Sequence, residues 1–357
     1  MGRTRRLFLL TLFLLILVSQ PASSLPYWFK EGVYARYVSR SDGENPWLWD
    51  SVSIAVSPNG TVTYYCPYVE FTWRVLNVSD GRAWLGLVIS GKNCAKRERK
   101  TLDEETARRL LREYQERYNF TGGECRTIKL EAGNVTVCED SYSERIGGNW
   151  MALTVDDGMG QLLNQSLGPE NFSRGGLVEL DMETGELLLN GTPIGRNFLW
   201  AENPASITGL EIMPGLKVER VKVVNSTVVT YYGDFHAPLY MAFTSQMAFE
   251  GGMGMCVILY DGSSGLAIAF FTPISPLWKA LGIDTAMIQD TALAKEHRDE
   301  FNGGDKMPPF GLVLAETNVD FTKPAKLPEE GPSKSAVAAA VGTIVLLTLL
   351  LVWRWKR

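Results

Sequence analysis

Histidine is nearly absent from this sequence of 357 residues, which contains two, His236 and His297. Zinc sites collect several His or Cys ligands at short spacing, so a histidine-based zinc centre is not expected. His236 lies two positions after Asp234, an arrangement that a general acid/base pair would use. A histidine with a structural role at the end of a strand is the interpretation that we favour.

Sequence motifs of the common enzyme classes are also missing. There is no G-x-S-x-G nucleophile elbow, no P-loop, no dinucleotide fingerprint and no EF-hand pattern. Residues 262–265, GSSG, indicate a turn, and Asp156 and Asp157 lack the further oxygen ligands of a calcium loop. The sequence therefore predicts no catalytic, cofactor-binding or metal-ligating residue. Paired carboxylates for glycoside hydrolysis stay open, because their pairing is spatial rather than sequential.

Basic residues are too few in the central part of the chain for a nucleic-acid-binding surface. Of the 35 Lys and Arg residues, six lie in residues 1–24 and 354–357, which leaves 29 against 40 acidic residues. The net charge of this part is therefore about −11. Nucleic acid binding depends on neutralising phosphates, so that class of partner is not expected.

The two ends of the sequence carry apolar runs of different length. Residues 7–18 form a short run behind three arginines, and small residues precede position 25. A bilayer core requires about 20 apolar residues, so residues 1–24 are predicted to be a secretory signal peptide rather than a span. An uncleaved N-terminal anchor is the alternative, and it would leave the rest of the chain outside as well.

The C-terminal run is long enough for a transmembrane helix. Residues 336–353 contain no charged residue, and three basic residues follow within 354–357. The positive-inside rule places this tail in the cytoplasm. Residues 324–335 combine Pro, Gly, Lys and Glu without an aromatic residue and are predicted to be an extended stalk. The expected topology in the cell membrane is a single pass, with the N-terminus outside and the C-terminus cytoplasmic.

Asparagine is concentrated in glycan acceptor patterns. Eight N-x-S/T sequons have no Pro in the middle position, whereas chance would give roughly two. Thr-rich strands raise such a count but do not account for this excess, so we predict a glycosylated surface protein. The absence of sequons after the last one is slight evidence that the later part faces a partner. The predicted acceptors are Asn59, Asn77, Asn119, Asn134, Asn164, Asn171, Asn190 and Asn225.

Five cysteines lie in the predicted ectodomain, where an oxidising environment favours disulfides. Cys125 and Cys138 flank two alternating runs around a turn at Gly133, so a bridge across that hairpin is expected. Cys66 and Cys94 would then pair and join two neighbouring hairpins. Cys256 is left over in an apolar run and is predicted to be a buried, inert thiol.

Alternation of apolar and polar residues predicts strands through most of the ectodomain. The predicted class is mainly β (α+β), an antiparallel meander or sandwich with one or two helices, plus the C-terminal transmembrane helix. Residues 33–91 are expected to form a meander. One amphipathic helix is predicted over residues 102–118, with a capping box in which Thr101 is the N-cap. Shorter helices are predicted over residues 276–282 and 286–300.

The ectodomain divides into a β-rich region with one helix, residues 25–150, and a second β-rich region, residues 151–323. These regions are either separate domains or parts of one. The second region contains an internal echo, because residues 178–194 align without gaps with residues 258–274. Each copy has an Asp four positions before a Gly, which predicts a hairpin with a left-handed Gly. Ordinary hairpin chemistry explains the echo better than repeated half-domains.

Trp47 and Trp49 are the best candidates for stacking on a sugar ring. They are two positions apart, so both indoles lie on one face if this segment is a strand. The alternative, which we favour, places them in the core of the first sheet.

The segments PYWFKEGVYARY, LYDGSSGLAIAF and LVLAETNVDF occur in a layout of signal peptide, sequon-rich β ectodomain, stalk and one span. In these features the chain resembles the uncharacterised single-pass surface glycoproteins of hyperthermophilic archaea. The resemblance implies no activity and no functional residue.

The leading functional prediction is a non-enzymatic interaction or accessory protein of the cell surface, with a protein partner in the membrane or cell envelope. A tethered hydrolase of polysaccharide or peptide is the second hypothesis. A solute-binding or sugar-binding module that uses Trp47 and Trp49 is the third. The sequence does not assign the ligand, the partner or the oligomeric state.

Overall fold

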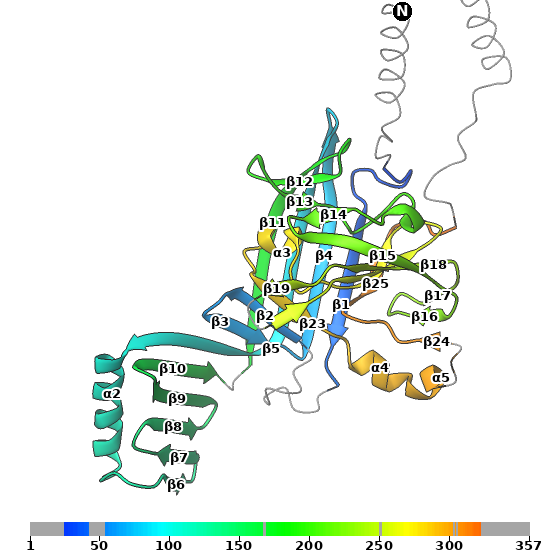
Figure 1. Cartoon of the computed structure of the whole chain (residues 1–357). Helices are drawn as coiled ribbons and strands as arrows, with labels where there is room; N and C mark the ends of the chain where they lie inside the picture. Colours follow the sequence, from blue (N-terminus) through cyan, green and yellow to red (C-terminus); the bar gives the residue numbers. More distant parts are fainter. Residues whose placement is uncertain are drawn as a thin grey trace, which may run out of the picture.

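The computed structural model describes residues 25–42, 54–166, 169–249, 252–302, 304 and 306–322. These residues form a mainly β structure, as the sequence predicts, with a large main body and a smaller distal module (Figure 1). No helix in these ranges is both long and apolar enough to cross a membrane. The predicted signal peptide, stalk, span and cytoplasmic tail lie outside the described residues.

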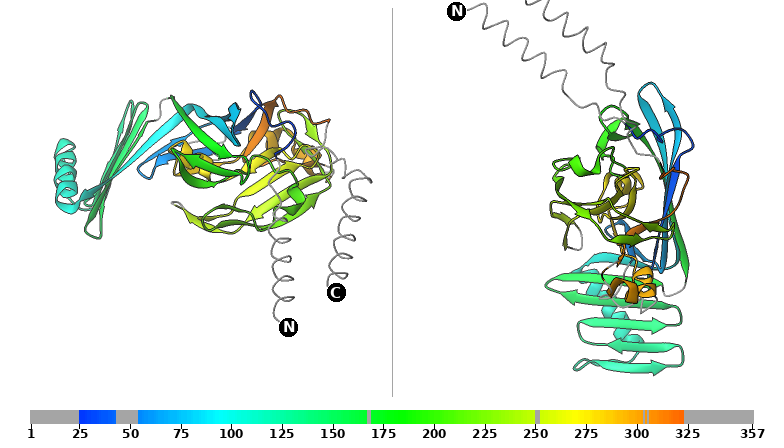
Figure 2. Two further views of the ribbon diagram at one scale, coloured as in Figure 1. Left: turned by 90° about the horizontal axis from the view of Figure 1, so that it is seen from above. Right: turned by 90° about the vertical axis from the view of Figure 1, so that its right-hand side faces the viewer.

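The main sheet is an antiparallel ladder that folds over the principal core, so that β1, β4 and β11 lie in one layer and β15 and β18 in another (Figure 2). In ladder order its strands are β13 (Thr192–Arg196), β12 (Glu186–Leu189), β11 (Glu170–Asp181), β5 (Arg82–Asp103), β4 (Tyr68–Ser79), β1 (Tyr34–Arg40), β25 (Leu312–Thr317), β22 (Ala267–Phe271), β21 (Val257–Asp261), β18 (Leu239–Thr244), β15 (Leu216–Val224) and β14 (Glu211–Met213).

The second sheet is also antiparallel and shares β5 with the main sheet. In ladder order its strands are β23 (Thr285–Ile288), β2 (Ile54–Asn59), β3 (Val62–Tyr65), β5, β10 (Met159–Ser166), β9 (Asn149–Asp156), β8 (Ser141–Ile146), β7 (Gly133–Val137) and β6 (Arg126–Leu130).

Smaller elements cover the edges of the main body. The helices of the described residues are α2 (Glu104–Arg117), α3 (Pro276–Ala280), α4 (Ala292–Glu296), α5 (Arg298–Asn302) and the 3₁₀ turn η1 (Pro204–Ser206). The remaining strands are β16 (Thr227–Val229), β17 (Asp234–Phe235), β24 (Lys306–Met307), β19 (Met247–Phe249) and β20 (Gly252–Gly254). The pair β16–β24 is parallel.

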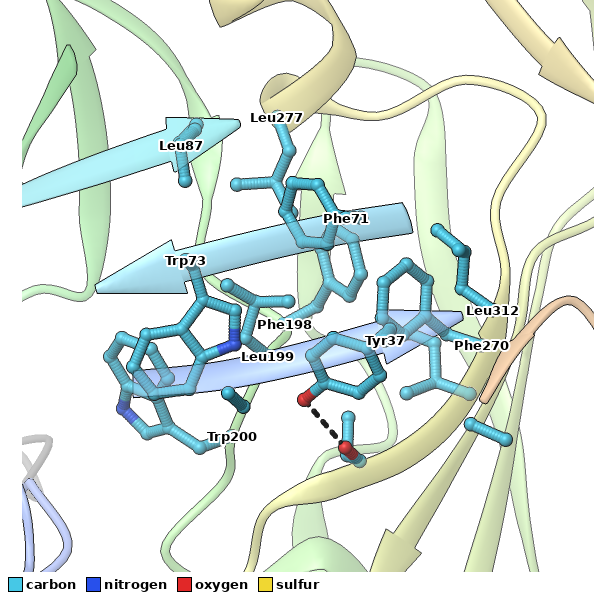
Figure 3. Packing of buried hydrophobic residues seen from close by; sticks show 14 of the residues in the cluster. Tyr37, Phe71, Trp73, Leu87, Phe198, Leu199, Trp200, Phe270, Leu277 and Leu312 are labelled. Carbon is cyan, nitrogen blue, oxygen red and sulfur yellow. Dashed lines mark hydrogen bonds between the residues drawn. The ribbon is translucent and has the colours of Figure 1, made fainter. Parts of the chain in front are cut away.

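The principal core is aromatic and lies between the layers of the main sheet (Figure 3). The Phe71 ring centroid lies 5.3 Å from Trp278 and 6.0 Å from Phe270, both in edge-on geometry. Tyr37 is fully buried, and its hydroxyl donates to the carbonyl of Ala267 at 2.8 Å. The cluster extends from Trp28 to Val319, so both predicted regions of the ectodomain contribute to one core.

One long strand, β5, connects the two sheets. Its first part, from Arg82 to Lys92, pairs with β4, and the same stretch pairs with β11 on the other side. Its second part pairs with β3 from Ala95 and with β10 as far as Asp103. The first part is thus paired on both sides, whereas the second part has partners on both sides only around residues 97–99. Between the two parts, Asn93 has a φ of 56°, so the backbone departs from the extended conformation at the crossing.

The disulfides are paired as the sequence predicts, Cys66 with Cys94 and Cys125 with Cys138. Cys66–Cys94 lies where β5 passes from one sheet to the other, between the end of β3 and the start of β4. Cys256 is buried, as predicted, and burial raises the pKa of its thiol to about 12. A thiol with so high a pKa is inert at neutral pH.

Gly91 leaves the space that the Cys66–Cys94 bridge occupies. A Cβ atom at this position would lie 2.5 Å from the Cys66 sulfur and 2.7 Å from the Cys94 sulfur. Atoms do not approach so closely without a shift of one partner. A side chain at position 91 is therefore incompatible with the bridge in its present position.

Gly91→Ala is expected to lower the free energy of unfolding by about 1–3 kcal/mol, because the added methyl group overpacks the disulfide. Chemical denaturation under non-reducing conditions measures the change. Gly175→Ala on β11 is the matched control, since its Cβ would have its nearest neighbour at 3.8 Å. Equal destabilisation by the two substitutions would contradict the steric role of Gly91.

The distal module consists of the second part of β5, α2 and β6–β10. It has its own core, in which Ala107 and Leu111 of α2 pack on Tyr142 and Leu153 of the sheet. Helix α2 approaches β10 closely at Gly160, where a Cβ would lie 2.2 Å from that of Ala107. The module therefore buries apolar surface without help from the main body.

The predicted helix is present, but the prediction of a capping box with Thr101 as the N-cap is wrong. Helix α2 begins at Glu104, and Asp103 is the N-cap, with its carboxylate accepting from the Thr106 amide at 2.8 Å. Thr101 lies in β5 and pairs with Gln161. The helix starts two residues later than predicted, because β5 continues beyond the predicted meander to Asp103, where it pairs with β10.

The meander predicted for residues 33–91 is interrupted. β1 pairs with β4 and β25, while β2 and β3, which lie between β1 and β4 in sequence, belong to the second sheet. The helix predicted over residues 286–300 is also partly wrong, because its start is strand β23 and only its later part is helical. The short helix predicted over residues 276–282 is present as α3.

The internal echo forms two hairpins of the same design. Asp181 accepts from the amides of residues 183 and 184, and Gly185 has a φ of 74°. Asp261 accepts from the Ser264 amide at 2.7 Å, and Gly265 has a φ of 72°. The predicted hairpins, with Gly in the left-handed region, are confirmed.

The first and last described segments are bonded to each other. The Tyr27 hydroxyl donates to the carbonyl of Asp320 at 3.1 Å. Asn318 accepts from the Tyr34 amide at 3.0 Å and donates to the Gly32 carbonyl at 3.1 Å. The two ends of the described chain therefore leave the main body together, at the end opposite the distal module (Figures 1 and 2).

Candidate functional site

His236 does not form the acid/base pair with Asp234 that the sequence raised. His236 is exposed, and its Nδ1 is 3.0 Å from the Thr227 hydroxyl. Its sequence neighbour Asp234 pairs instead with Lys306 at 3.1 Å. His297 Nδ1 is 2.9 Å from a carboxylate oxygen of Glu300. These contacts match the structural role that the sequence favours for His236.

The other candidate residues from the sequence do not form a ligand site among the described residues. Trp47 and Trp49 lie outside the described residues, so sugar stacking on them stays a prediction. Asp156 ends β9, and Asp157 has a φ of 44° in the turn before β10. Among the residues that the structure describes, no group of three or more His, Cys, Asp or Glu side chains is placed to hold a metal ion.

All of the predicted glycan acceptors are at the surface. The side chains of Asn59, Asn77, Asn119, Asn134, Asn164, Asn171, Asn190 and Asn225 are each exposed. Three of them, Asn119, Asn134 and Asn164, belong to the distal module. Exposure is what an oligosaccharide requires of its acceptor, and glycosylation itself stays a prediction.

Asp290 is a buried carboxylate that sequence reasoning missed. It is 2% exposed and accepts from the Tyr231 hydroxyl at 2.5 Å and from the Arg40 amide at 2.9 Å. Arg40 Nε also donates to the Tyr231 hydroxyl at 2.8 Å. Because the Leu293 amide donates to the other Asp290 oxygen, this group fastens α4 to β1. Both carboxylate oxygens of Asp290 therefore accept hydrogen bonds within the fold.

Burial raises the pKa of the Asp290 carboxyl above its usual value, and the hydrogen bonds from Tyr231 and the backbone oppose that rise. The neutral form therefore gains stability on folding. This gain is present below the carboxyl's unfolded pKa and is lost as pH rises through the raised folded pKa.

Asp290→Asn is expected to change the pH dependence of thermal stability. The Tm of the wild type minus that of the variant should fall as pH rises from about 3 to about 7, because the variant never carries the buried charge. Asp103→Asn is the control of opposite sign, since hydrogen bonds from Thr106 hold the pKa of exposed Asp103 below its usual value. A pH-independent difference for Asp290→Asn would contradict this account.

A cavity of about 560 Å³ lies on the face of the second sheet that carries α2. Four of its residues form a row across the strands, with Glu98 opposite Asn164, Asn164 opposite Met151 and Met151 opposite Glu144. The Tyr114 hydroxyl of α2 lies 3.8 Å from the Met151 sulfur, which places this row on the helix side. The helix covers part of the face and leaves the cavity beside it.

The cavity combines carboxylates with other polar side chains and apolar surface. Asn149 and Ser166 supply polar groups, and Met151 supplies apolar surface. Trp150 borders the cavity, but it alternates with Met151 along β9, so its indole projects to the other face of the sheet. Polar side chains around an apolar surface suit a polar ligand with an apolar face. Glu170 of β11 also lines the cavity, so the main body contributes to it.

Two carboxylates of this row, Glu98 and Glu144, are already engaged. Glu144 accepts from the Tyr142 hydroxyl at 2.5 Å and from the Tyr118 hydroxyl at 3.5 Å. Glu98 forms an ion pair with Lys96. Glu98 and Glu144 lie three strands apart, a backbone separation of about 14 Å, whereas glycosidase carboxyls are about 5–9.5 Å apart. This row therefore lacks the spacing of a hydrolytic pair.

The chain matches no protein-family model, no curated protein and no solved structure. Its function is therefore argued from its own residues.

Asn164 is a predicted glycan acceptor and also lines the cavity. A glycan on Asn164 would cover Met151, which lies opposite it on β9, so Asn164→Gln is expected to raise the oxidation of Met151 severalfold in hydroxyl-radical footprinting. Asn119→Gln removes an acceptor of the same module that does not line the cavity, and it should leave that oxidation unchanged. Equal oxidation in all three proteins would contradict the prediction.

Proposed function

We propose that this chain is a membrane-anchored, glycosylated extracytoplasmic protein that acts by binding a partner rather than by catalysis. The observation that carries the proposal is the position of the distal module. The described chain leaves the main body at one end, through the segments joined by Tyr27 and Asp320, and the module lies at the other. The predicted stalk and span follow the place where the chain leaves the main body. In this arrangement the module points away from the membrane.

The link between the main body and the module supports the same function. β5 runs from one into the other as a single strand, and the Cys66–Cys94 bridge fixes the crossing. A surface intended for a partner gains affinity when it is held in one orientation beforehand. The module has its own hydrophobic core, which supports its surface independently of the core of the main body.

The α2-side cavity is the proposed contact site. Its volume of about 560 Å³ lies within the range of ligand sites, about 300–1,000 Å³. Met151 and Ile146 provide its apolar surface, with polar side chains around them. The second candidate, a tethered hydrolase, finds less support here because Glu98 and Glu144 are engaged and widely separated.

Site-specific photo-cross-linking in native membranes tests this function. A photoreactive residue at exposed Asn149, which lines the cavity, should capture a stoichiometric neighbour, identified by mass spectrometry. The same residue at exposed Lys30, beside the chain ends, should capture far less of it. Ile146→Ala, which removes apolar surface from the contact site, should lower capture at Asn149 by about tenfold. Capture at Lys30 alone, or none at either position, would contradict the proposal.

A further inference from the structure

A second cavity, of about 240 Å³, lies on the other face of the second sheet, over β23, β2, β3 and β5. Arg97 and Arg99 both line it, because alternate residues of a strand point to one face. Glu98, between them, lines the α2-side cavity instead. The two guanidinium groups therefore lie on one face of the sheet, and the Glu98 carboxylate lies on the other.

The Arg97 side chain is buried and held in place by Tyr65. It is 6% exposed, its Nη1 donates to the Tyr65 hydroxyl at 2.5 Å, and its guanidinium lies 4.9 Å from the centre of the Tyr65 ring. Burial lowers the pKa of Arg97 below its usual value, Tyr65 partly offsets this, and Arg99 lowers it further. The positive charge is thus desolvated and lies next to another positive charge.

The rest of the lining supplies hydroxyl groups. Ser57 and Thr63 face each other across β2 and β3, with their oxygens 2.9 Å apart. Thr61 and Thr285 also line the cavity. The lining residues that the structure describes include no Asp or Glu. Arginine forks and hydroxyl donors together are the groups that bind oxyanions, since a guanidinium offers parallel N–H bonds to two oxygens.

We propose that this cavity binds a tetrahedral oxyanion, sulfate or phosphate, either free or carried on a sugar. Arg97, fixed by Tyr65, provides the buried N–H donors from the floor of the cavity. Arg99 is exposed and closes on the anion from the solvent side. Thr63 and Thr285 are positioned to donate to the remaining oxygens. The cavity has room for about eight water molecules at about 30 Å³ each, enough for such an ion with part of a sugar ring.

Calorimetric titration of the full chain in non-ionic detergent with sodium sulfate tests the site, at constant ionic strength set by chloride. Saturable binding of one sulfate per chain is expected, with a rise in Tm that chloride does not reproduce. Arg99→Gln should weaken sulfate binding by about tenfold, the equivalent of one charge-assisted pair. Because Arg99 is exposed, this variant keeps the fold.

Arg145→Gln is the matched control, because Arg145 is an exposed arginine of β8 that does not line the cavity. It removes the same charge and should leave sulfate affinity unchanged. Arg97→Lys keeps the charge but not the fork and should also weaken binding. Equal loss in the Arg99 and Arg145 variants, or sulfate effects no larger than those of chloride, would overturn the proposal.

A sulfated monosaccharide, titrated in parallel, distinguishes the two sources of the anion. Tighter binding than inorganic sulfate would identify a sugar as the carrier, and equal affinity would identify the free ion. Both results require the Arg99→Gln loss to support the site. The readout does not involve a protein partner, so it is independent of the binding function proposed for the distal module.

Discussion

The structure depends on one strand that serves two sheets. β5 gives its first part to the main sheet, where it is paired on both sides, and its second part to the distal module, where it pairs mainly with β10. Its register is therefore fixed by β4 and β11 in one sheet and by β3 and β10 in the other. The Cys66–Cys94 bridge ties the segment between β3 and β4 to β5 at the crossing point. Gly91 leaves the space that the bridge occupies.

Local chemistry made much of this fold predictable. The hairpins at Asp181 and Asp261, both disulfides and the buried Cys256 follow from residues close together in sequence, or from simple counting. The order of strands does not. β1 pairs with β4 and β25, and the choice between near and distant partners depends on which faces are buried against the shared core. The length of β5 likewise depends on β10, which comes some sixty residues later.

The sites were less predictable than the fold, for the same reason. The period of two in KRERK puts Arg97 and Arg99 on one face, but only the placement of β2, β3 and β23 makes that face a cavity. Asp290 carries no sequence signal, because its burial results from contacts with Arg40 and Tyr231, far away in the chain. The α2-side cavity also joins residues from both sheets. Trp47 and Trp49, the aromatic candidates from the sequence, lie outside the described residues.

The bonded chain ends have a mechanical consequence. In the proposed arrangement, tension between a partner held at the distal module and the exit of the chain near Asp320 would run along β5 and pass through β4 and β1 to β25. These strands are roughly aligned with that pull, so the hydrogen bonds between them would be loaded in shear and would share the force. Separating the strands would require many hydrogen bonds to break together, whereas pulling at one edge would break them one at a time.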